Sequence, residues 1–328
     1  MITTRRAALI RVLAGTTVAL GATLPAAAQD RWPTKPVRMV VPFSPGGSTD
    51  VIARLVGQRL SVLWGQTVVI ENRAGAGGNV GADVVAKSAA DGYTLLMASG
   101  SITINPHLYK RMPFDTKKDL VPITNVASGA MLVVVPDNSP ARNLKELIAI
   151  AKAKPGSLNF GSAGVGSQVH LAAENFADAA GIDISHVPYK GEALGYTDLI
   201  GGQIQLMVGN FAAASALLGK GRLRALAITS KKRSPLLPDL PTVDESGLPG
   251  FENTGWFGLL APAGTPPDVL ARVQRDTAAV LAQTPIKASL YVQGLSPVGN
   301  SSADFAAAMD AESERWAAVV KNRKLSTN

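Results

Sequence analysis

Short apolar runs that end in glycine-rich turns and lead into helical patterns constrain the fold of this 328-residue chain most strongly. The first example begins at Val37. Val37–Phe43 is typical of a strand, Gly46 and Gly47 form the turn, and Asp50–Leu63 repeats apolar residues at helical spacing. Strands that alternate with helices pair in parallel, so the pattern predicts an α/β fold with mostly parallel sheets flanked by helices.

The alternation indicates two units of this kind. In the first unit we expect further strands at 67–70 and 94–98, with a helix that ends near Ala90 between them. In the second unit we expect strands at 132–135, 158–160, 184–187, 204–208 and 223–228, and helices at 144–154 and 167–180. The remaining pattern predicts a strand at 255–260 and helices at 269–283, 285–293 and 303–320.

The last part of the chain has too few strands for a third sheet, so we expect it to complete the first unit. The sequence therefore predicts two lobes, residues 29–128 with 252–328 and residues 129–251, with crossings near Val126–Met131 and Gly250–Asn253. In open parallel sheets, ligands bind beyond the carboxyl ends of the strands. The glycine-rich loops of both lobes are therefore expected to face one cleft.

The first 28 residues have the composition of a signal peptide. Arg5, Arg6 and Arg11 precede a weakly apolar segment, Val12–Leu24, and Ala26–Ala28 supplies small residues for cleavage. We therefore expect Met1–Ala28 to be removed on export to the periplasm. A membrane anchor is less favoured, because glycine and threonine dilute a short segment. The arginine pair leaves both the general and the twin-arginine export routes open.

Composition excludes several classes of site. The chain contains no cysteine, which excludes disulfides, thiolate metal sites and a cysteine nucleophile. Its three histidines are too scattered in sequence to indicate a metal site, and no cofactor is expected. Loss of the signal-peptide arginines lowers the formal net charge from +8 to +5. The one basic cluster, Lys231–Arg233, has no aromatic neighbours, so nucleic acid is not an expected partner.

The turn after the first strand is suited to an anion. Gly46 and Gly47 carry no Cβ, so backbone N–H groups at this turn can approach a bound group closely. The helix that follows has unpaired N–H donors and the positive end of its dipole at the same place. Such a site needs no cationic side chain. A small anionic ligand is therefore the first hypothesis.

Six motifs occur in an order that resembles one family. They are Val-Pro-Phe-Ser-Pro-Gly-Gly-Ser-Thr-Asp (41–50), Glu-Asn-Arg-Ala-Gly-Ala-Gly-Gly (71–78), Asp-Gly-Tyr-Thr-Leu-Leu (91–96), Gly-Ser-Ala-Gly-Val-Gly-Ser (161–167), His-Val-Pro-Tyr-Lys-Gly (186–191) and Leu-Pro-Thr-Val-Asp-Glu-Ser-Gly (240–247). Together they resemble the Bug family, the extracytoplasmic solute receptors of tripartite tricarboxylate transport systems. The resemblance extends from Trp32 to the last helix.

The resemblance implies a two-lobed periplasmic binding protein, type II-like, that closes on a small carboxylate. Its expected partners are that carboxylate and the membrane subunits of a tripartite tricarboxylate transporter, and these receptors usually act as monomers without enzymatic activity. Carried onto this chain, the carboxylate contacts would be Phe43, Ser44, Gly46, Gly47 and Ser48 in one lobe and Ser162, Gly164, Ser167 and Gln168 in the other.

Four further side chains are candidates for the cleft. Ser99 and Ser101 follow the third strand and could line its floor, Tyr189 could form a wall, and Phe211 could cover an apolar ligand stem. Several family members carry an acidic residue near the position of Gly209, suited to an amine. Its absence here favours a simple or aromatic carboxylate over an amino acid, and the resemblance itself implies that the ligand is often a dicarboxylate.

Two other functions remain open from the sequence. A receptor that hands its liganded form to a sensor kinase would have the same binding site. An exported hydrolase would use Ser167 and His170, but the chain has no Gly-x-Ser-x-Gly elbow and these residues lie one helical turn apart.

Overall fold

The computed structural model describes residues 32–322 and 325, so the expected signal peptide lies outside the described residues. The strands are β1 (Val37–Val41), β2 (Val68–Asn72), β3 (Thr94–Ser99), β4 (Leu120–Pro136), β5 (Asn159–Ser162), β6 (Ser185–Pro188), β7 (Leu206–Asn210), β8 (Leu223–Ile228), β9 (Thr254–Pro262) and β10 (Leu295–Pro297). The helices are α1 (Ser48–Trp64), α2 (Asn79–Ala86), α3 (Ser101–Leu108), α4 (Thr116–Asp119), α5 (Leu144–Ala153), α6 (Gln168–Ala180), α7 (Glu192–Ile200), α8 (Phe211–Leu218), α9 (Pro267–Ala282), α10 (Thr284–Tyr291) and α11 (Ser302–Asn322), with a 3-10 turn at Ala76–Gly78.

A single long strand, β4, joins two sheets. The strand order is β2-β1-β3-β9-β4-β7-β5-β6, and β8 and β10 also pair with β4. Residues 120–130 of β4 pair antiparallel with β9, and residues 131–136 pair antiparallel with β7 and β8. We call β1, β2, β3, β9, β10 and the first part of β4 the first sheet, and the remainder the second sheet. The crossing expected near Val126–Met131 is therefore a continuous strand rather than a loop.

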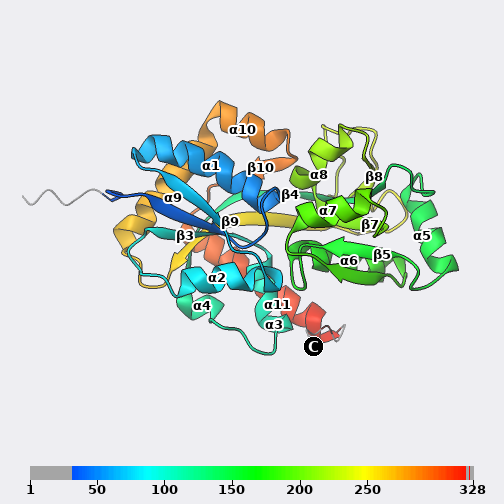
Figure 1. The fold of residues 1–328 in the computed structure, drawn as a ribbon, viewed down its shortest axis with the longest axis horizontal. Coiled ribbons are helices and arrows are strands. Elements are labelled where there is room, and N and C mark those ends of the chain that lie inside the picture. Colours follow the sequence, from blue (N-terminus) through cyan, green and yellow to red (C-terminus); the bar gives the residue numbers. More distant parts are fainter. Residues whose placement is uncertain (1–31, 323–324, 326–328) are drawn as a thin grey trace, which may run out of the picture. The chain divides into compact units, whose positions relative to one another are not determined.

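Each sheet has a parallel core and antiparallel additions. In the first sheet β1 pairs in parallel with β2 and β3, and β9 is antiparallel to β3. In the second sheet β5 pairs in parallel with β6 and β7. Figure 1 shows the two groups of helices around these sheets, with β9 and β4 passing from one group to the other. The expected two-lobed α/β fold is confirmed, and we call the parts around the two sheets the first and second lobes.

Helices cover both faces of each sheet, which explains the continuous apolar runs in the strands. Along β4, Met131 and Val133 enter one buried cluster with Phe160, whereas Leu132 and Val134 enter another on the opposite face. On one face of the first sheet, α2, α3 and α11 pack over buried residues of β1 and β3. On the other face, α1, α9 and α10 lie together (Figure 1).

Some elements differ from the sequence expectation. Helices α3, α4, α7 and α8 and strand β10 were not expected. Helix α3 contains Pro106 and the β-branched residues Ile102, Thr103 and Ile104, which disfavour a helix locally. Helix α8 begins directly after β7, because Asn210 ends the strand and also precedes the helix without an intervening turn.

Candidate functional site

The turn between β1 and α1 is held by one buried carboxylate. Asp50 accepts hydrogen bonds from the Gly46 N–H (3.0 Å), Arg54 Nε (2.9 Å) and Asn72 Nδ2 (2.9 Å). Burial opposes ionisation of Asp50, but these hydrogen bonds outweigh it and lower its pKa. Gly46 has φ +83°, a conformation that favours glycine. Asp50 therefore fixes the turn that presents the start of α1.

Helix α1 begins without a side-chain cap. Its N-cap is Gly47, which has no side chain to bind the first N–H groups. The Ser48 N–H instead donates to Glu192 Oε2 in the other lobe, at 3.2 Å. An uncapped N-terminus of a buried helix needs an acceptor from elsewhere, and here that acceptor is a carboxylate.

The corresponding loop of the second lobe uses its serines internally. Ser162 Oγ accepts the Gly164 N–H at 3.0 Å and forms a hydrogen bond with His186 Nε2 at 2.6 Å. Ser167 is the N-cap of α6, and its Oγ accepts the His170 N–H at 3.3 Å. These side chains shape the loop and leave the next residue, Gln168, to reach the cleft.

Gln168 connects the lobes. Its Oε1 accepts the Gly100 N–H at 3.2 Å and the Trp256 N–H at 3.4 Å, both from the first lobe. Its Nε2 donates to Asn210 Oδ1 at 3.2 Å. The side chain therefore spans from the start of α6 to the starts of α3 and α8. It supplies both donor and acceptor groups inside the cleft.

A small cavity lies where these helix starts meet. Its volume is about 10 Å³, roughly the space of one water molecule. It is lined by Phe43, Gly47, Ser48, Thr49, Ser99, Ala163, Gln168, Val169, Glu192 and Asn210. Most of these residues lie within two residues of the N-termini of α1, α3, α6, α7 and α8, and Phe43 and Ala163 belong to the turns before α1 and α6. Five helix N-termini therefore lie around one cavity, which favours negative charge there.

Five of the residues expected at the site line this cavity: Phe43, Gly47, Ser48, Ser99 and Gln168. The other eight lie outside its lining. Ser44, Gly46, Ser162, Gly164 and Ser167 form the two turns, and Ser101 Oγ forms a hydrogen bond with Ser99 Oγ at 3.1 Å. The Tyr189 hydroxyl donates to Asp198 Oδ2 at 2.7 Å, and Phe211 is buried in the core of the second lobe.

The sequence reasoning missed Glu192 and Asn210. Glu192 is the first residue of α7, and Asn210 precedes α8. Neither helix was expected, so their N-termini were not considered as part of the cleft. The sequence did contain a signal for the start of α7. It is the turn Tyr189-Lys190-Gly191 immediately before Glu192, in one of the motifs that carry the family resemblance.

Glu192 places an acidic group beside Gly209. A Cβ built on Gly209 would lie 3.5 Å from Glu192 Oε1. The expectation of a simple or aromatic carboxylate in preference to an amino acid took the missing acidic side chain at position 209 as its reason. That reason does not hold in three dimensions, because α7 brings a carboxylate to the same place.

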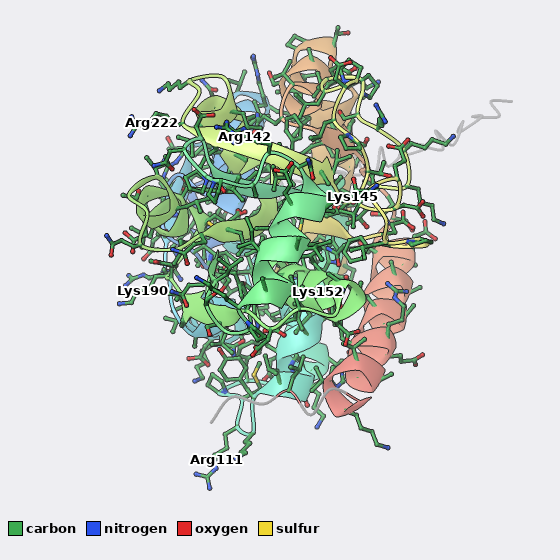
Figure 2. All side chains as sticks on the ribbon, turned by 90° about the vertical axis from the view of Figure 1, so that its right-hand side faces the viewer. Arg111, Arg142, Lys145, Lys152, Lys190 and Arg222 are labelled. Atoms are coloured by element: carbon green, nitrogen blue, oxygen red, sulfur yellow. The ribbon has the colours of Figure 1, made fainter. Side chains whose placement is uncertain are left out.

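None of the described residues that line the small cavity has a cationic side chain. Lys190, two residues before Glu192, is exposed and points away from the protein (Figure 2). Burial, together with the hydrogen bond to Asp198, raises the pKa of Tyr189 to about 12, so this phenol is neutral at physiological pH. Positive potential in the cavity therefore comes from backbone N–H groups and helix ends.

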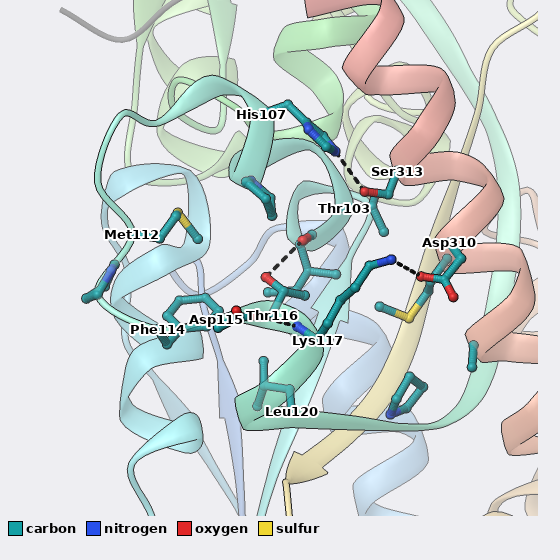
Figure 3. Close-up of a pocket in the computed structure, with 16 residues that line it drawn as sticks. Thr103, His107, Met112, Phe114, Asp115, Thr116, Lys117, Leu120, Asp310 and Ser313 are labelled. Carbon is teal, nitrogen blue, oxygen red and sulfur yellow. Dashed lines mark hydrogen bonds and ion pairs between the residues drawn. The ribbon is translucent and has the colours of Figure 1, made fainter.

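A larger cavity lies on the first lobe, away from the helix starts. It has a volume of about 670 Å³ and lies among α3, α4, the loop between them and α11 (Figure 3). Its walls include Met112, Phe114 and Leu120. Lys117 Nζ pairs with Asp310 Oδ1 at 2.7 Å, and His107 Nε2 forms a hydrogen bond with Ser313 Oγ at 2.8 Å (Figure 3).

Two lobes that share β4 and enclose a cavity lined by helix N-termini define a two-lobed binding protein. Residues 52–325 match the model of the tripartite tricarboxylate transporter family receptor. Protein BugT of Bordetella pertussis is 39% identical over 294 residues, which cover 89% of this chain and 90% of that protein. The chain belongs to this family of tripartite tricarboxylate transporter receptors, the Bug proteins.

Solved structures agree with this assignment. The structure of R. palustris Rpa4515 with adipate is 38% identical with a TM-score of 0.88, and the match covers 90% of this chain and all of that one. MatC from Rhodopseudomonas palustris with bound malate is 30% identical with a TM-score of 0.84, over 88% of this chain and all of that one. Among the described residues, no helix is long and apolar enough to span a membrane.

Proposed function

We propose that this chain is a periplasmic receptor that captures a small organic carboxylate by closure of its two lobes. The observation that carries the proposal is the meeting of five helix N-termini at one cavity that no cationic side chain lines. Two relatives of the same fold hold adipate and malate. Carboxylates, dicarboxylates and aromatic carboxylates among them, are therefore the first ligands to test.

The small volume of the cavity supports binding by closure. A volume of about 10 Å³ does not admit an organic acid, so uptake requires the lobes to separate. Direct contacts that join the lobes near this place include Ser44 N–H to Lys190 O (3.0 Å), Ser48 N–H to Glu192, Gly100 N–H and Trp256 N–H to Gln168, and Tyr109 hydroxyl to Val165 O (2.9 Å). We place the lobe boundaries at 128/129 and 251/252, near the change of partners along β4.

Within this proposal, the thirteen residues expected at the site divide into two roles. Phe43, Gly47, Ser48, Ser99 and Gln168 contact the ligand, and the other eight hold the turns and walls in place. We further propose that Met1–Ala28 is removed on export, and that the closed form is delivered to the membrane subunits of a tripartite tricarboxylate transporter. A receptor for a membrane sensor kinase would have the same cleft.

We propose no catalytic step. The hydrolase alternative requires Ser167 as a nucleophile, but its Oγ accepts the backbone N–H of His170 as the cap of α6. His170 Nδ1 accepts the Gly166 N–H at 3.2 Å, and its ring stacks on His186 with centroids 3.9 Å apart. These contacts support structural roles for both residues.

A thermal-shift panel on the mature chain tests the proposal. A ligand at 100 times its dissociation constant should stabilise the protein by about 2.7 kcal/mol. We expect at least one carboxylate to raise the midpoint of unfolding, and neutral sugars to leave it unchanged. Stabilisation by sugars alone would contradict the proposal.

A glycine substitution tests the place of binding. Gly47 has φ −79°, so its backbone tolerates a side chain, and a Cβ there would lie 3.9 Å from the Glu192 Cβ. The branches of valine would extend into the interface between the lobes. Gly47→Val should therefore weaken carboxylate binding at least about tenfold, whereas Gly219→Val, at an exposed position on α8's C-terminal side, should not. Unchanged affinity in Gly47→Val would remove this turn from the site.

A further inference from the structure

Glu192 occupies an unusual position for a carboxylate in a carboxylate receptor. It is 5% exposed and lines the small cavity. Its Oε1 accepts the Asn210 N–H at 2.9 Å and Asn210 Nδ2 at 3.0 Å, and its Oε2 accepts the Ser48 N–H at 3.2 Å. These donors lie at the starts of α8 and α1. A side chain of the protein therefore uses N–H groups of the kind that would otherwise bind a ligand carboxylate.

The hydrogen bonds of Glu192 suit its ionised form. All three are donated to the carboxylate oxygens, and the contacts of the described residues include none in which the carboxyl group donates. The bonds lower the pKa of Glu192, but burial dominates and raises it. Desolvation thus makes the negative charge costly, and a cation brought next to it would relieve that cost.

Among the residues that the structure describes, none that lines the cavity supplies that cation. Glu192 is the only ionisable residue among those that line the cavity. Arg54, in the second turn of α1, is engaged by both oxygens of Asp50. Tyr196 also lies near Glu192, and burial raises the pKa of this phenol well above its usual value, with a further contribution from the charge of Glu192. The Tyr196 hydroxyl has no hydrogen-bond partner in the described part of the chain.

We propose that Glu192 determines the specificity of this receptor by pairing with an ammonium group on the ligand. The inference rests on the proposed function, because it assumes that the ligand also carries a carboxylate held by the remaining helix N-termini. The ligand class is an amino carboxylate, either an α-amino acid or an ω-amino acid. A plain dicarboxylate of the same length would place a second negative charge beside a buried carboxylate and is disfavoured.

Matched ligands provide the first test. A thermal-shift panel of straight-chain monocarboxylates, dicarboxylates, ω-amino carboxylates and α-amino acids identifies the strongest ligand. Calorimetric titration then compares it with analogues in which a carboxylate or a hydrogen replaces the ammonium, for example 4-aminobutyrate with glutarate and butyrate. We expect the ammonium-bearing compound to bind at least about tenfold more tightly than both analogues. A strongest ligand without an ammonium, or an analogue that binds equally well, would overturn the inference.

Charge removal provides the second test. Glu192→Gln keeps the size of the side chain and removes its charge. It should cut the ratio of the two affinities, ammonium ligand over dicarboxylate, at least about tenfold. Because this ratio is measured within one variant, a general loss of stability does not imitate the effect. Glu192→Asp, which keeps the charge, should keep the preference and serves as the second variant if Glu192→Gln does not fold.

A matched control and the failure outcomes complete the design. Glu314→Gln removes the same charge from an exposed position on α11 and should leave every affinity within about twofold. An affinity ratio that Glu192→Gln leaves unchanged, or that Glu192→Asp abolishes, would assign Glu192 a structural role only. If carboxylates bind but the ammonium preference is absent, this inference fails alone. If no carboxylate or amino carboxylate binds, the proposed function fails with it.

Discussion

The two cavities of this protein differ in size and in chemistry, and the smaller one is the candidate site. The larger cavity, about 670 Å³, is lined by apolar side chains and by charged groups that already have partners, such as Lys117 with Asp310. The smaller one, about 10 Å³, is lined by helix starts and by Glu192. A groove on one lobe keeps its volume, whereas a cleft between lobes loses its volume when the lobes touch. We therefore choose the candidate site by its polar donors and not by its volume.

Helix α3 lies between the two cavities. Just before it, Ser99 lines the small cavity and the Gly100 N–H donates to Gln168, and Thr103 on the helix lines the large cavity. Glu312 of α11 accepts hydrogen bonds from Thr103 Oγ1 (2.8 Å) and Trp256 Nε1 (2.6 Å). Thr103 in the lining of the large cavity is thus connected through Glu312 to Trp256, whose N–H binds Gln168 of the small cavity. The two cavities have no lining residue in common.

The largest loss of carboxylate affinity is expected from a substitution that keeps the two lobes from coming into contact. Gly77 has φ +61°, and a Cβ there would lie 2.1 Å from Val165 O of the second lobe. Gly77→Ala should therefore prevent closure and weaken carboxylate binding at least about a hundredfold, as measured by calorimetric titration. Gly65→Ala is the control, because Gly65 has φ +63° and nothing within 4 Å of its added Cβ. Equal losses in both variants would attribute the effect to backbone strain.

A smaller effect is expected from acid, which should lower the free energy of unfolding through His186, the partner of Ser162 in the loop before α6. Burial, with a contribution from the neighbouring His170, lowers the pKa of His186 to about 3 from an unfolded value near 6.5. The folded state binds this proton less readily than the unfolded state. The contribution of neutral His186 to the free energy of unfolding is therefore fully present above pH 6.5 and is lost as pH falls from about 6.5 toward 3.

The measurement is the free energy of unfolding against pH, by chemical denaturation. We expect His186→Phe, which keeps an aromatic ring against Phe160, to flatten the decline in this range. His107→Phe, in the lining of the large cavity, should flatten it less, because the pKa of His107 is lowered without reaching so low a value. A decline that is identical in wild type and His186→Phe would rule out His186 as its source.

The smallest effect is expected from the charged rim of the large cavity. The side chains of Lys117 and Asp310 are 68% and 57% exposed, so their ion pair is well solvated. Lys117→Ala should change the midpoint of thermal unfolding by less than about 3 °C and carboxylate affinity by less than about twofold. A large loss of affinity would instead indicate that the large cavity is an anion site, which contradicts the choice of the small cavity as the candidate site.

The sequence predicted the fold well where periodicity and glycine turns agree. The strand from Val37, the helix after Gly47 and the strand at Leu223–Ile228 are each present within a few residues of the expected bounds. The long β4 was not foreseen, because its first part carries Pro122 and Gly129 and pairs through two irregularities with β9. The local sequence pattern around residues 120–130 does not show that a strand far along the chain, β9, will pair with this segment.

The site was harder to predict than the fold. The turn Phe43–Ser48 and Gln168 could be anticipated, because a glycine or serine before a helix marks an exposed N-terminus. Glu192 could not, because its importance depends on α7 facing the starts of α1 and α8 from other parts of the chain. Ser162 and Ser167 have hydroxyls that could bind a ligand, but in the structure both accept backbone N–H groups of their own loop or helix. The sequence does not show whether such a hydroxyl binds the backbone or a ligand.

We expect a carboxylate to bind where the helix N-termini meet and not in the larger cavity. The most direct measurement is a crystal structure with a brominated analogue of the strongest carboxylate ligand, located by its anomalous scattering. We expect bromine density between the lobes, next to Phe43, Ser48 and Gln168. Bromine density among α3, α4 and α11, with none between the lobes, would contradict it.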